Sequence, residues 1–207
     1  TTGFFATSDL GGSVGNGLLQ DYLVSFNYKD KEMFLSPGLK KSGLYKFIPP
    51  KKGKSHILRI IRELISFEPQ TNGTNVGEAL RYLTNAIKKK STAFLLSDFI
   101  DEKDYESALK VANKKHDLIG LRIYDRLQEN MPNLGLVPFY DAESKATVLV
   151  DTSSKSTRME YNKRASEHKK TLLNQFNKSG IDYTSISTED NYVKPLMNLF
   201  KKREKKR

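Results

Sequence analysis

The stretch that decides the fold is Thr92-Ala-Phe-Leu-Leu-Ser-Asp-Phe99. Its first five residues are uncharged and mostly apolar, and they show no alternation before the run stops at Ser97 and Asp98. An unbroken apolar run of this length favours a strand buried on both faces, as in a parallel sheet covered by helices. Ligands of open α/β sheets gather outside the carboxyl ends of the strands, where Asp98 would lie. From position alone, this carboxylate is either a ligand of a bound group or a cap of the loop.

A helix is predicted just before this strand. Asn75 is its N-cap, and Glu78 three residues later completes a capping-box-like pair. Apolar residues then recur at helical spacing and give the helix one apolar face: Val76, Ala79, Leu80, Leu83 and Ile87. Thr74 therefore lies in the loop that enters this helix, at the same edge of the sheet as Asp98. A hydroxyl and a carboxylate at one edge suit an oxygen-loving cation such as Mg²⁺.

The rest of the chain alternates helices and strands. Further helices are predicted from Ser55 to before Pro69, from residues 101–104 to 116, over 159–176 and over 193–200, and further strands over 118–124 and 181–186. Residues 134–140 and 147–150 flank a polar turn and predict a hairpin, in which Pro138 favours an edge position. This alternation predicts an α/β fold in one domain, with a mainly parallel sheet, helices on both faces and a small edge hairpin.

Composition restricts the class of protein. The chain has 207 residues, of which 37% are hydrophobic, and this suits one sizeable folded domain. It has no cysteine, so a disulfide framework and a zinc–thiolate site are excluded. No apolar run approaches the roughly 18 residues of a membrane span, and residues 1–5 lack the basic and apolar regions of a signal peptide. We therefore predict a cytoplasmic protein.

The C-terminus is the most basic part of the chain. Residues 201–207 hold six basic residues and one acid, and they supply +5 of the net charge of +11. We interpret this run as a solvated tail, too polar to be packed, whose deletion leaves the fold intact. Nucleic-acid binding would need stacking aromatics interleaved with the basic residues, and the run has none.

Few residues show a catalytic pattern. The histidines have no partner at metal-ligand spacing, and we interpret all three as structural: His56, His116 and His168. Ser97 lacks the Gly-x-Ser-x-Gly pattern of a nucleophile elbow. Asp125, at the end of the strand 118–124, could form an acid/base pair with Glu129, but loop capping and hydrogen bonding fit both residues better.

Several short motifs resemble, in this order, the domain-of-unknown-function-58 family: Phe47–Gly53, Gly73–Asn75, Leu95–Phe99 and His116–Gly120. The resemblance continues through Asp125 and Pro132 to Tyr192–Pro195. It implies a bacterial protein with a von Willebrand factor A-like, Rossmann-like fold. Residues 46–200 would form this domain, residues 1–45 would be its poorly matching N-terminal segment, and residues 201–207 the basic tail.

The resemblance also implies a metal site. Thr74 and Asp98 match two positions of the metal-ion-dependent adhesion site of von Willebrand A folds, in which an Asp-x-Ser-x-Ser stretch after the first strand supplies most direct ligands. No such stretch occurs in this sequence, and the first strand is predicted to be missing with it, as in a chain truncated at its N-terminus. Residues 4–9 are a candidate replacement strand. A site that keeps only Thr74 and Asp98 of these ligands is predicted to bind Mg²⁺ weakly at most.

By resemblance, the function is that of a protein-interaction domain and not of an enzyme. The implied partner is a MoxR-type AAA+ ATPase, in chaperone-like or cofactor-insertion work, and the metal would bridge to a carboxylate of the partner. Two alternatives stay open: a metal-dependent phosphate-handling enzyme, and nucleic-acid binding through the basic tail. The lack of a second close carboxylate, a general base and a nucleophile argues against the enzyme.

Overall fold

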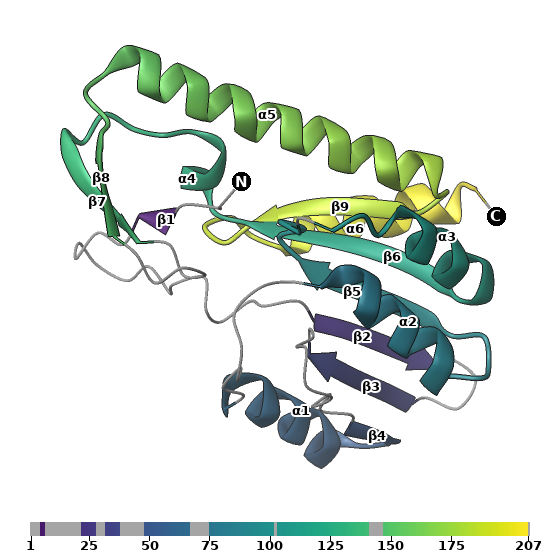
Figure 1. Cartoon of the computed structure of the whole chain (residues 1–207). Coiled ribbons are helices and arrows are strands. Elements are labelled where there is room, and N and C mark those ends of the chain that lie inside the picture. Colours follow the sequence, from purple (N-terminus) through teal and green to yellow (C-terminus); the bar gives the residue numbers. More distant parts are fainter. Residues whose placement is uncertain are drawn as a thin grey trace.

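The computed structural model describes residues 5–6, 22–27, 32–37, 48–66, 75–101, 103–140 and 147–206. Its larger sheet has six strands, in the order β4 (Ile48–Lys51), β3 (Glu32–Pro37), β2 (Tyr22–Asn27), β5 (Thr92–Ser97), β6 (Asp117–Tyr124) and β9 (Asp182–Ser187). A smaller sheet joins β1 (Phe5–Ala6), β7 (Leu136–Tyr140) and β8 (Thr147–Asp151). Figure 1 shows the smaller sheet at one end of the larger one, next to α4 (Arg126–Glu129).

Only half of the larger sheet is parallel. β5, β6 and β9 run parallel to one another, as predicted, but β2 is antiparallel to both β3 and β5, and β3 is antiparallel to β4. The prediction of a mainly parallel sheet is therefore wrong for this half. Residues 28–31 alone connect β2 to β3, and so short a connection permits only an antiparallel hairpin, because parallel neighbours need a crossover.

The sheet has no gap beside β5. β5 pairs with β2 on one side and with β6 on the other, so it has a neighbour along both edges. Phe5 and Ala6, from the candidate replacement segment, pair instead with Tyr140 and Phe139 of β7 in the smaller sheet. The prediction of residues 4–9 as the replacement strand is therefore wrong for the larger sheet, where β2 lies next to β5.

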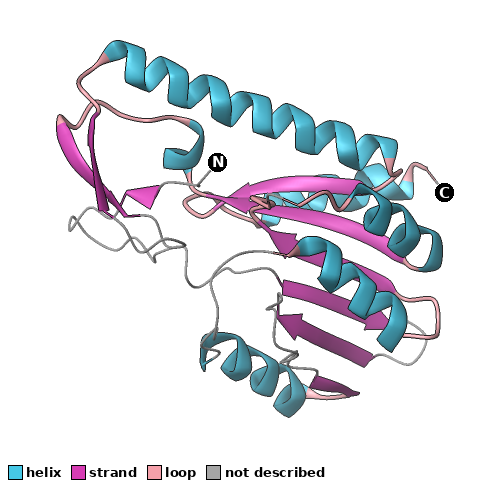
Figure 2. Cartoon of the chain, in the orientation of Figure 1, coloured by secondary structure: helices cyan, strands magenta, loops and turns pink. Residues whose placement is uncertain are grey.

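Helices cover both faces of the parallel strands, as predicted (Figure 2). One core cluster brings α2 (Val76–Ala86), α3 (Glu106–Lys115) and α5 (Lys155–Lys178) onto β5 and β6. On the opposite face, α6 (Val193–Glu204) packs Leu199 against Ile119 and Leu121 of β6. The remaining long helix, α1 (Lys54–Ser66), follows β4, and no helix in the described part of the chain is long and apolar enough to cross a membrane.

The two central parallel strands differ in burial. In β5, Ala93 and Leu95 are buried towards α2 and α3, while Phe94 and Leu96 are only partly covered by α6. β6 is the strand buried on both faces, because α6 packs directly on it. The unbroken apolar run of residues 92–96 therefore marked a central strand, but full burial on two faces belongs to its neighbour.

The long helix α5 ends as its sequence predicts. Gly180 adopts φ 66°, and the backbone N–H groups of Gly180 and Ile181 donate to the carbonyls of Asn177 (3.1 Å) and Phe176 (3.0 Å), which is a Schellman motif. This end fixes Phe176 over Gly120 of β6, where a Cβ atom would lie 3.0 Å from the ring. Gly120 thus allows the close approach of α5 to the sheet.

The basic tail is partly packed. α6 continues through Glu204, and Arg203 donates to Asp117 (2.6 Å) and Asp182 (2.8 Å), with only 17% of its side chain exposed. Lys206 also reaches Asp182 at 2.5 Å. The interpretation of residues 201–207 as too polar to be packed is therefore wrong for Arg203, which ties α6 to the amino ends of β6 and β9.

Candidate functional site

The carboxyl ends of β5, β6 and β9 meet at one edge of the sheet. We call the loops that leave them, residues 98–101, 125–130 and 188–191, the carboxyl edge. The loops after β6 and β9 contact each other: the Thr188 N–H donates to the Tyr124 carbonyl at 3.0 Å, and Arg126 forms an ion pair with Asp190 at 2.5 Å. This edge is where the sequence places its candidate residues.

The first loop of the carboxyl edge has an unusual backbone. Phe99 lies at φ 60°, in the left-handed region that non-glycine residues rarely adopt, and its ring is fully buried. The N–H of Phe99 donates to Ser97 Oγ at 2.8 Å, and the N–H of Ile100 donates to Asp98 Oδ1 at 3.1 Å. His168 Nε2 lies 3.2 Å from the Phe99 carbonyl. Of its two predicted roles, Asp98 is thus seen in the capping one.

The loop into α2 and the loop after β5 are adjacent. Thr74 itself lies outside the described residues, but the N–H of Val76 donates to Asp101 Oδ2 at 2.8 Å. Asn75 caps α2 by accepting from the Glu78 N–H at 3.0 Å, as predicted. Asp101 was assigned to the start of the next helix, but α3 begins only at Glu106, and Asp101 serves α2 instead.

Metal ligands are not gathered at this edge in the described part of the chain. No group of three or more His, Cys, Asp or Glu side chains there is placed to hold a metal ion. Asp98 contributes one carboxylate, and Asp101 is already bonded to the N–H groups of Val76 and Lys103. The described residues therefore offer a cation few ligands at this edge.

Asp125 and Glu129 point to different partners. Asp125 is the N-cap of α4: its Oδ1 accepts from the Leu127 N–H at 2.8 Å, and Gln128 completes a capping box. Glu129 accepts from Arg122 Nη1 at 2.6 Å and from Lys169 Nζ at 2.9 Å. The two carboxylates thus hold separate structural contacts, and nothing in this arrangement makes them an acid/base pair.

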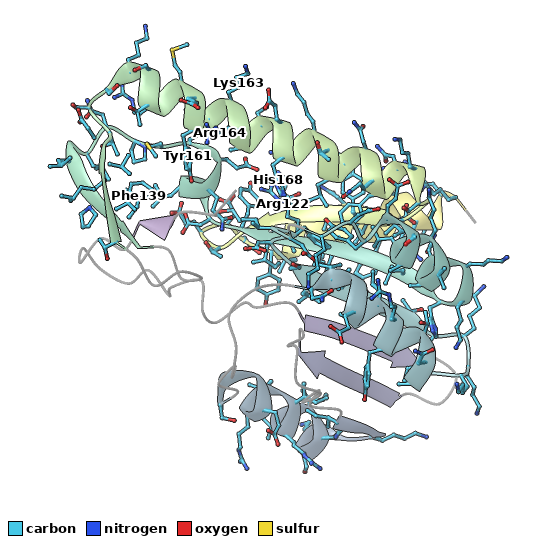
Figure 3. The ribbon with its side chains drawn as sticks, viewed as in Figure 1. Arg122, Phe139, Tyr161, Lys163, Arg164 and His168 are labelled. Atoms are coloured by element: carbon cyan, nitrogen blue, oxygen red, sulfur yellow. The ribbon has the colours of Figure 1, made fainter. Side chains whose placement is uncertain are left out.

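Arg122 and Lys169 were missed by the sequence reasoning. Arg122 lies within β6 and is only 5% exposed, and its guanidinium carbon is 4.5 Å from the centre of the Tyr124 ring. Figure 3 places Arg122 and His168 between α5 and the sheet. The available signal was an arginine inside an otherwise apolar strand, because a buried cation requires a partner.

Burial and neighbouring charges shift the pKa values of Glu129 and His168. Burial opposes the charged form of Glu129, but hydrogen bonds from Arg122 and Lys169 outweigh it and lower the pKa of this carboxyl. Burial also lowers the pKa of His168, helped by the nearby positive charge of Arg122 and opposed by the hydrogen bond to Phe99. A neutral His168 can donate from Nε2 to the Phe99 carbonyl.

Acidification is expected to destabilise the protein. His116 and His168 have pKa values lowered from 6.5, so the unfolded state binds protons that the folded state excludes. The free energy of unfolding should therefore fall as the pH drops below 6.5, and fall further below 4.5 as Glu129 loses its charge. Urea unfolding between neutral and acidic pH measures this, and His168→Gln should flatten the first step. A stability that rises on acidification would contradict these assignments.

A serine–histidine pair lies at the opposite edge of the sheet. Ser91 Oγ is 3.1 Å from His116 Nδ1, and both residues are buried before the strands β5 and β6 begin. Burial, and then the positive charge of Lys115, lowers the pKa of His116. Because neither side chain is open to a substrate, we interpret the pair as structural.

A shallow hollow lies between α5 and the hairpin β7–β8. It measures about 170 Å³ and is lined by Met131, Phe139, Val150, Thr157, Glu160, Tyr161 and Arg164. Figure 3 shows Phe139, Tyr161 and Arg164 around it. The Tyr161 hydroxyl donates to the Leu127 carbonyl at 3.0 Å, so this residue fastens α4 to α5.

Comparisons with known proteins identify relatives without an assigned activity. Residues 38–171 match the family described as "Protein of unknown function DUF58". The uncharacterized protein MAV169 of Mycobacterium avium is 18% identical over 160 residues, which cover 76% of this chain and 94% of that protein. The uncharacterized proteins Mb1516 of Mycobacterium bovis and Rv1480 of Mycobacterium tuberculosis show the same identity, and the match covers 50% of each. The chain thus spans about half the length of these two relatives.

One solved structure resembles the chain in outline. It is the crystal structure of the conserved hypothetical protein BatB from Bacteroides thetaiotaomicron, 15% identical, with a TM-score of 0.44. The superposition covers 79% of this chain and 76% of that one.

Proposed function

We propose, from the premise that the chain belongs to the family of proteins of unknown function DUF58, that it is a protein-interaction domain and not an enzyme. The resemblance of its motifs suggests the partner class, a MoxR-type AAA+ ATPase in chaperone-like or cofactor-insertion work. We place the contact at the carboxyl edge and the protein in the cytoplasm, where such an ATPase has its nucleotide. The von Willebrand factor A-like fold is part of this proposal.

The observation that carries the proposal is the turn at Phe99. A non-glycine residue in the left-handed region is strained, and such strain persists where the surrounding structure fixes it, often at ligand clamps and switches. Here Ser97, Asp98 and His168 all bond to the backbone of residues 99–100. The turn is thus held in one conformation at the edge where α/β sheets bind their ligands.

No specific observation supports either of the two alternative functions, a phosphate-handling enzyme or nucleic-acid binding. The Ser91–His116 pair does not support an enzyme, because it is buried at the opposite edge. The basic tail supports nucleic-acid binding less than its composition suggests, because Arg203 and Lys206 are engaged by Asp117 and Asp182.

Asp98→Ala tests the proposal. We expect it to weaken binding of the MoxR-type ATPase of the same genome about tenfold, as loss of a charged contact does, and to remove any response to Mg²⁺. Calorimetric titration of the parent with Mg²⁺ should give roughly millimolar affinity or none. The loss of the Ile100 hydrogen bond should cost about 1 kcal/mol of stability, which a thermal melt separates from binding.

Two control variants make this test specific. Asp104→Ala removes the same kind of bond, from the Glu106 N–H at 2.9 Å, but lies beyond the Phe99 turn. Lys90→Glu changes an exposed charge at the opposite edge of the sheet. If either control weakened ATPase binding as much as Asp98→Ala, the carboxyl edge would not be the contact.

A further inference from the structure

Two cations share one carboxylate at the carboxyl edge. Glu129 Oε1 lies 2.6 Å from Arg122 Nη1 and 2.9 Å from Lys169 Nζ, and Glu129 Oε2 lies 3.0 Å from the same Lys169 atom. Two positive charges and one negative charge leave the group with a net charge of +1. The exposed fractions of the side chains rise from 6% for Arg122 through 19% for Glu129 to 38% for Lys169. The excess positive charge therefore opens to solvent at Lys169.

Arg122 also holds an unused hydrogen-bond donor. Its Nε is buried and has no hydrogen-bond partner among the described residues. The guanidinium packs on the Tyr124 ring at 4.5 Å, and Lys169 Nζ lies 5.8 Å from the centre of the same ring. Leaving a buried N–H of a charged group unpaired is unfavourable, so this side chain has capacity for a further acceptor.

Glu129 lies at the end of a short surface helix. α4 has only four residues, none of them buried. Its start is fastened by the Asp125 cap and by the bond from Tyr161 to Leu127, and the chain beyond its last residue, Glu129, by the bond from the Met131 N–H to α5 at 2.9 Å. Asn130, which follows, is exposed. Moving the Glu129 side chain away breaks its ion pairs with Arg122 and Lys169 but leaves the core clusters intact, because they contain no residue of α4.

We propose that Arg122, Tyr124 and Lys169 form a carboxylate-binding site for an acidic side chain of a partner protein, and that Glu129 occupies this site when no partner is bound. The incoming carboxylate takes the place of Glu129 on Lys169 and accepts from Arg122. No metal is required for this contact, which distinguishes it from a metal-bridged one. The inference rests on the proposed function in placing the partner at the carboxyl edge.

Two substitutions with opposite expected effects on carboxylate binding test this site. The probe is fluorescein-labelled octaglutamate, with octaglutamine as the uncharged reference, and the readout is fluorescence anisotropy with the full chain at low ionic strength. Lys169→Gln should weaken octaglutamate binding about tenfold, and Glu129→Gln should strengthen it about fivefold, because the internal competitor loses its charge. Glutamine still accepts a hydrogen bond from Arg122, which helps this variant to fold.

Neighbouring residues on α5 provide matched controls. Lys170→Gln and Glu167→Gln make the same charge changes at exposed positions, and each should alter binding by less than about twofold, as isolated surface charges do. Equal effects of the substitutions at residues 169 and 170 would show general attraction to a basic protein and would overturn the proposal. The proposal would also fail if Glu129→Gln did not strengthen binding.

A measurement on the parent chain covers the case in which Glu129→Gln does not fold. In nitrogen-15 spectra, the side-chain Nε–H signal of Arg122 should shift on addition of octaglutamate and not of octaglutamine, and an unmoved signal would overturn the site. If the ATPase binds the parent and the Lys169→Gln variant equally, this inference fails while the proposed function stands. If octaglutamate binds at Lys169 but the ATPase does not bind, the site stands and the proposed partner fails.

Discussion

Replacing Phe176 by alanine is expected to lower the free energy of unfolding by about 3–5 kcal/mol. The ring is fully buried, meets Phe99 edge-on at 5.0 Å and Tyr183 at 5.2 Å, and covers Gly120. α5 buries only Leu172 and Phe176, so the substitution removes one of the two buried side chains of a 24-residue helix. Urea unfolding followed by circular dichroism measures the loss.

Phe200→Ala is the matched control. Its ring is 43% exposed and meets Phe94 at 6.3 Å, so its loss should cost about 1 kcal/mol. A second test uses Gly120→Ala, which should destabilise the parent by about 1–3 kcal/mol through crowding of the ring. In the Phe176→Ala background the added methyl group should be neutral or favourable. Equal losses from Phe176→Ala and Phe200→Ala would contradict the role of Phe176 as the anchor of α5.

Arg122→Met is expected to cost about 2–3 kcal/mol of stability. Methionine keeps much of the apolar contact of the side chain but leaves Glu129 partly buried with Lys169 as its remaining cation. The loss should be smaller than for a carboxylate left with no partner, because Lys169 stays within hydrogen-bonding distance. Thermal or urea unfolding at neutral pH measures the change.

Arg126→Met controls for the loss of an arginine from the same edge. Arg126 is 57% exposed and pairs with Glu189 and Asp190, which are about half exposed. Its removal should change stability by about 0–1 kcal/mol, and salt should reduce this further. If Arg122→Met proved as mild as Arg126→Met, the buried ion pair would make no net contribution to the fold.

Local signals in the sequence predicted local structure well. The N-cap at Asn75 and the C-terminal Gly180 of α5 are confirmed, because each depends on hydrogen bonds between residues fewer than six positions apart. The hairpin β7–β8 is confirmed, since two short strands around a polar turn pair with each other. Its predicted edge position is wrong, because β7 lies between β1 and β8 in a separate sheet. The parallel strands β5, β6 and β9 followed from the alternation of apolar runs with helical patterns.

Local sequence signals could not predict contacts between segments that are far apart in the sequence. The antiparallel position of β2 beside β5 depends on pairing across more than 60 residues, which no spacing rule predicts. Arg203 was assigned to a solvated tail because its two carboxylate partners lie 86 and 21 residues away. Glu129 was recognised as a polar residue near the sheet edge, but its partner Lys169 lies 40 residues later, on another helix. In each case the sequence showed the type of one residue, whereas its contact partner could be identified only from the folded structure.

Hydrogen exchange of the whole chain, with and without the MoxR-type ATPase of the same genome, tests the central claim most directly. The account predicts slower exchange in residues 98–101 and 125–130 when the ATPase is bound, because their backbone groups lie at the contact. Residues 87–91 and 115–117, at the opposite edge of the sheet, should exchange at unchanged rates. A complex that protects the opposite edge and leaves the carboxyl edge unchanged would contradict the account.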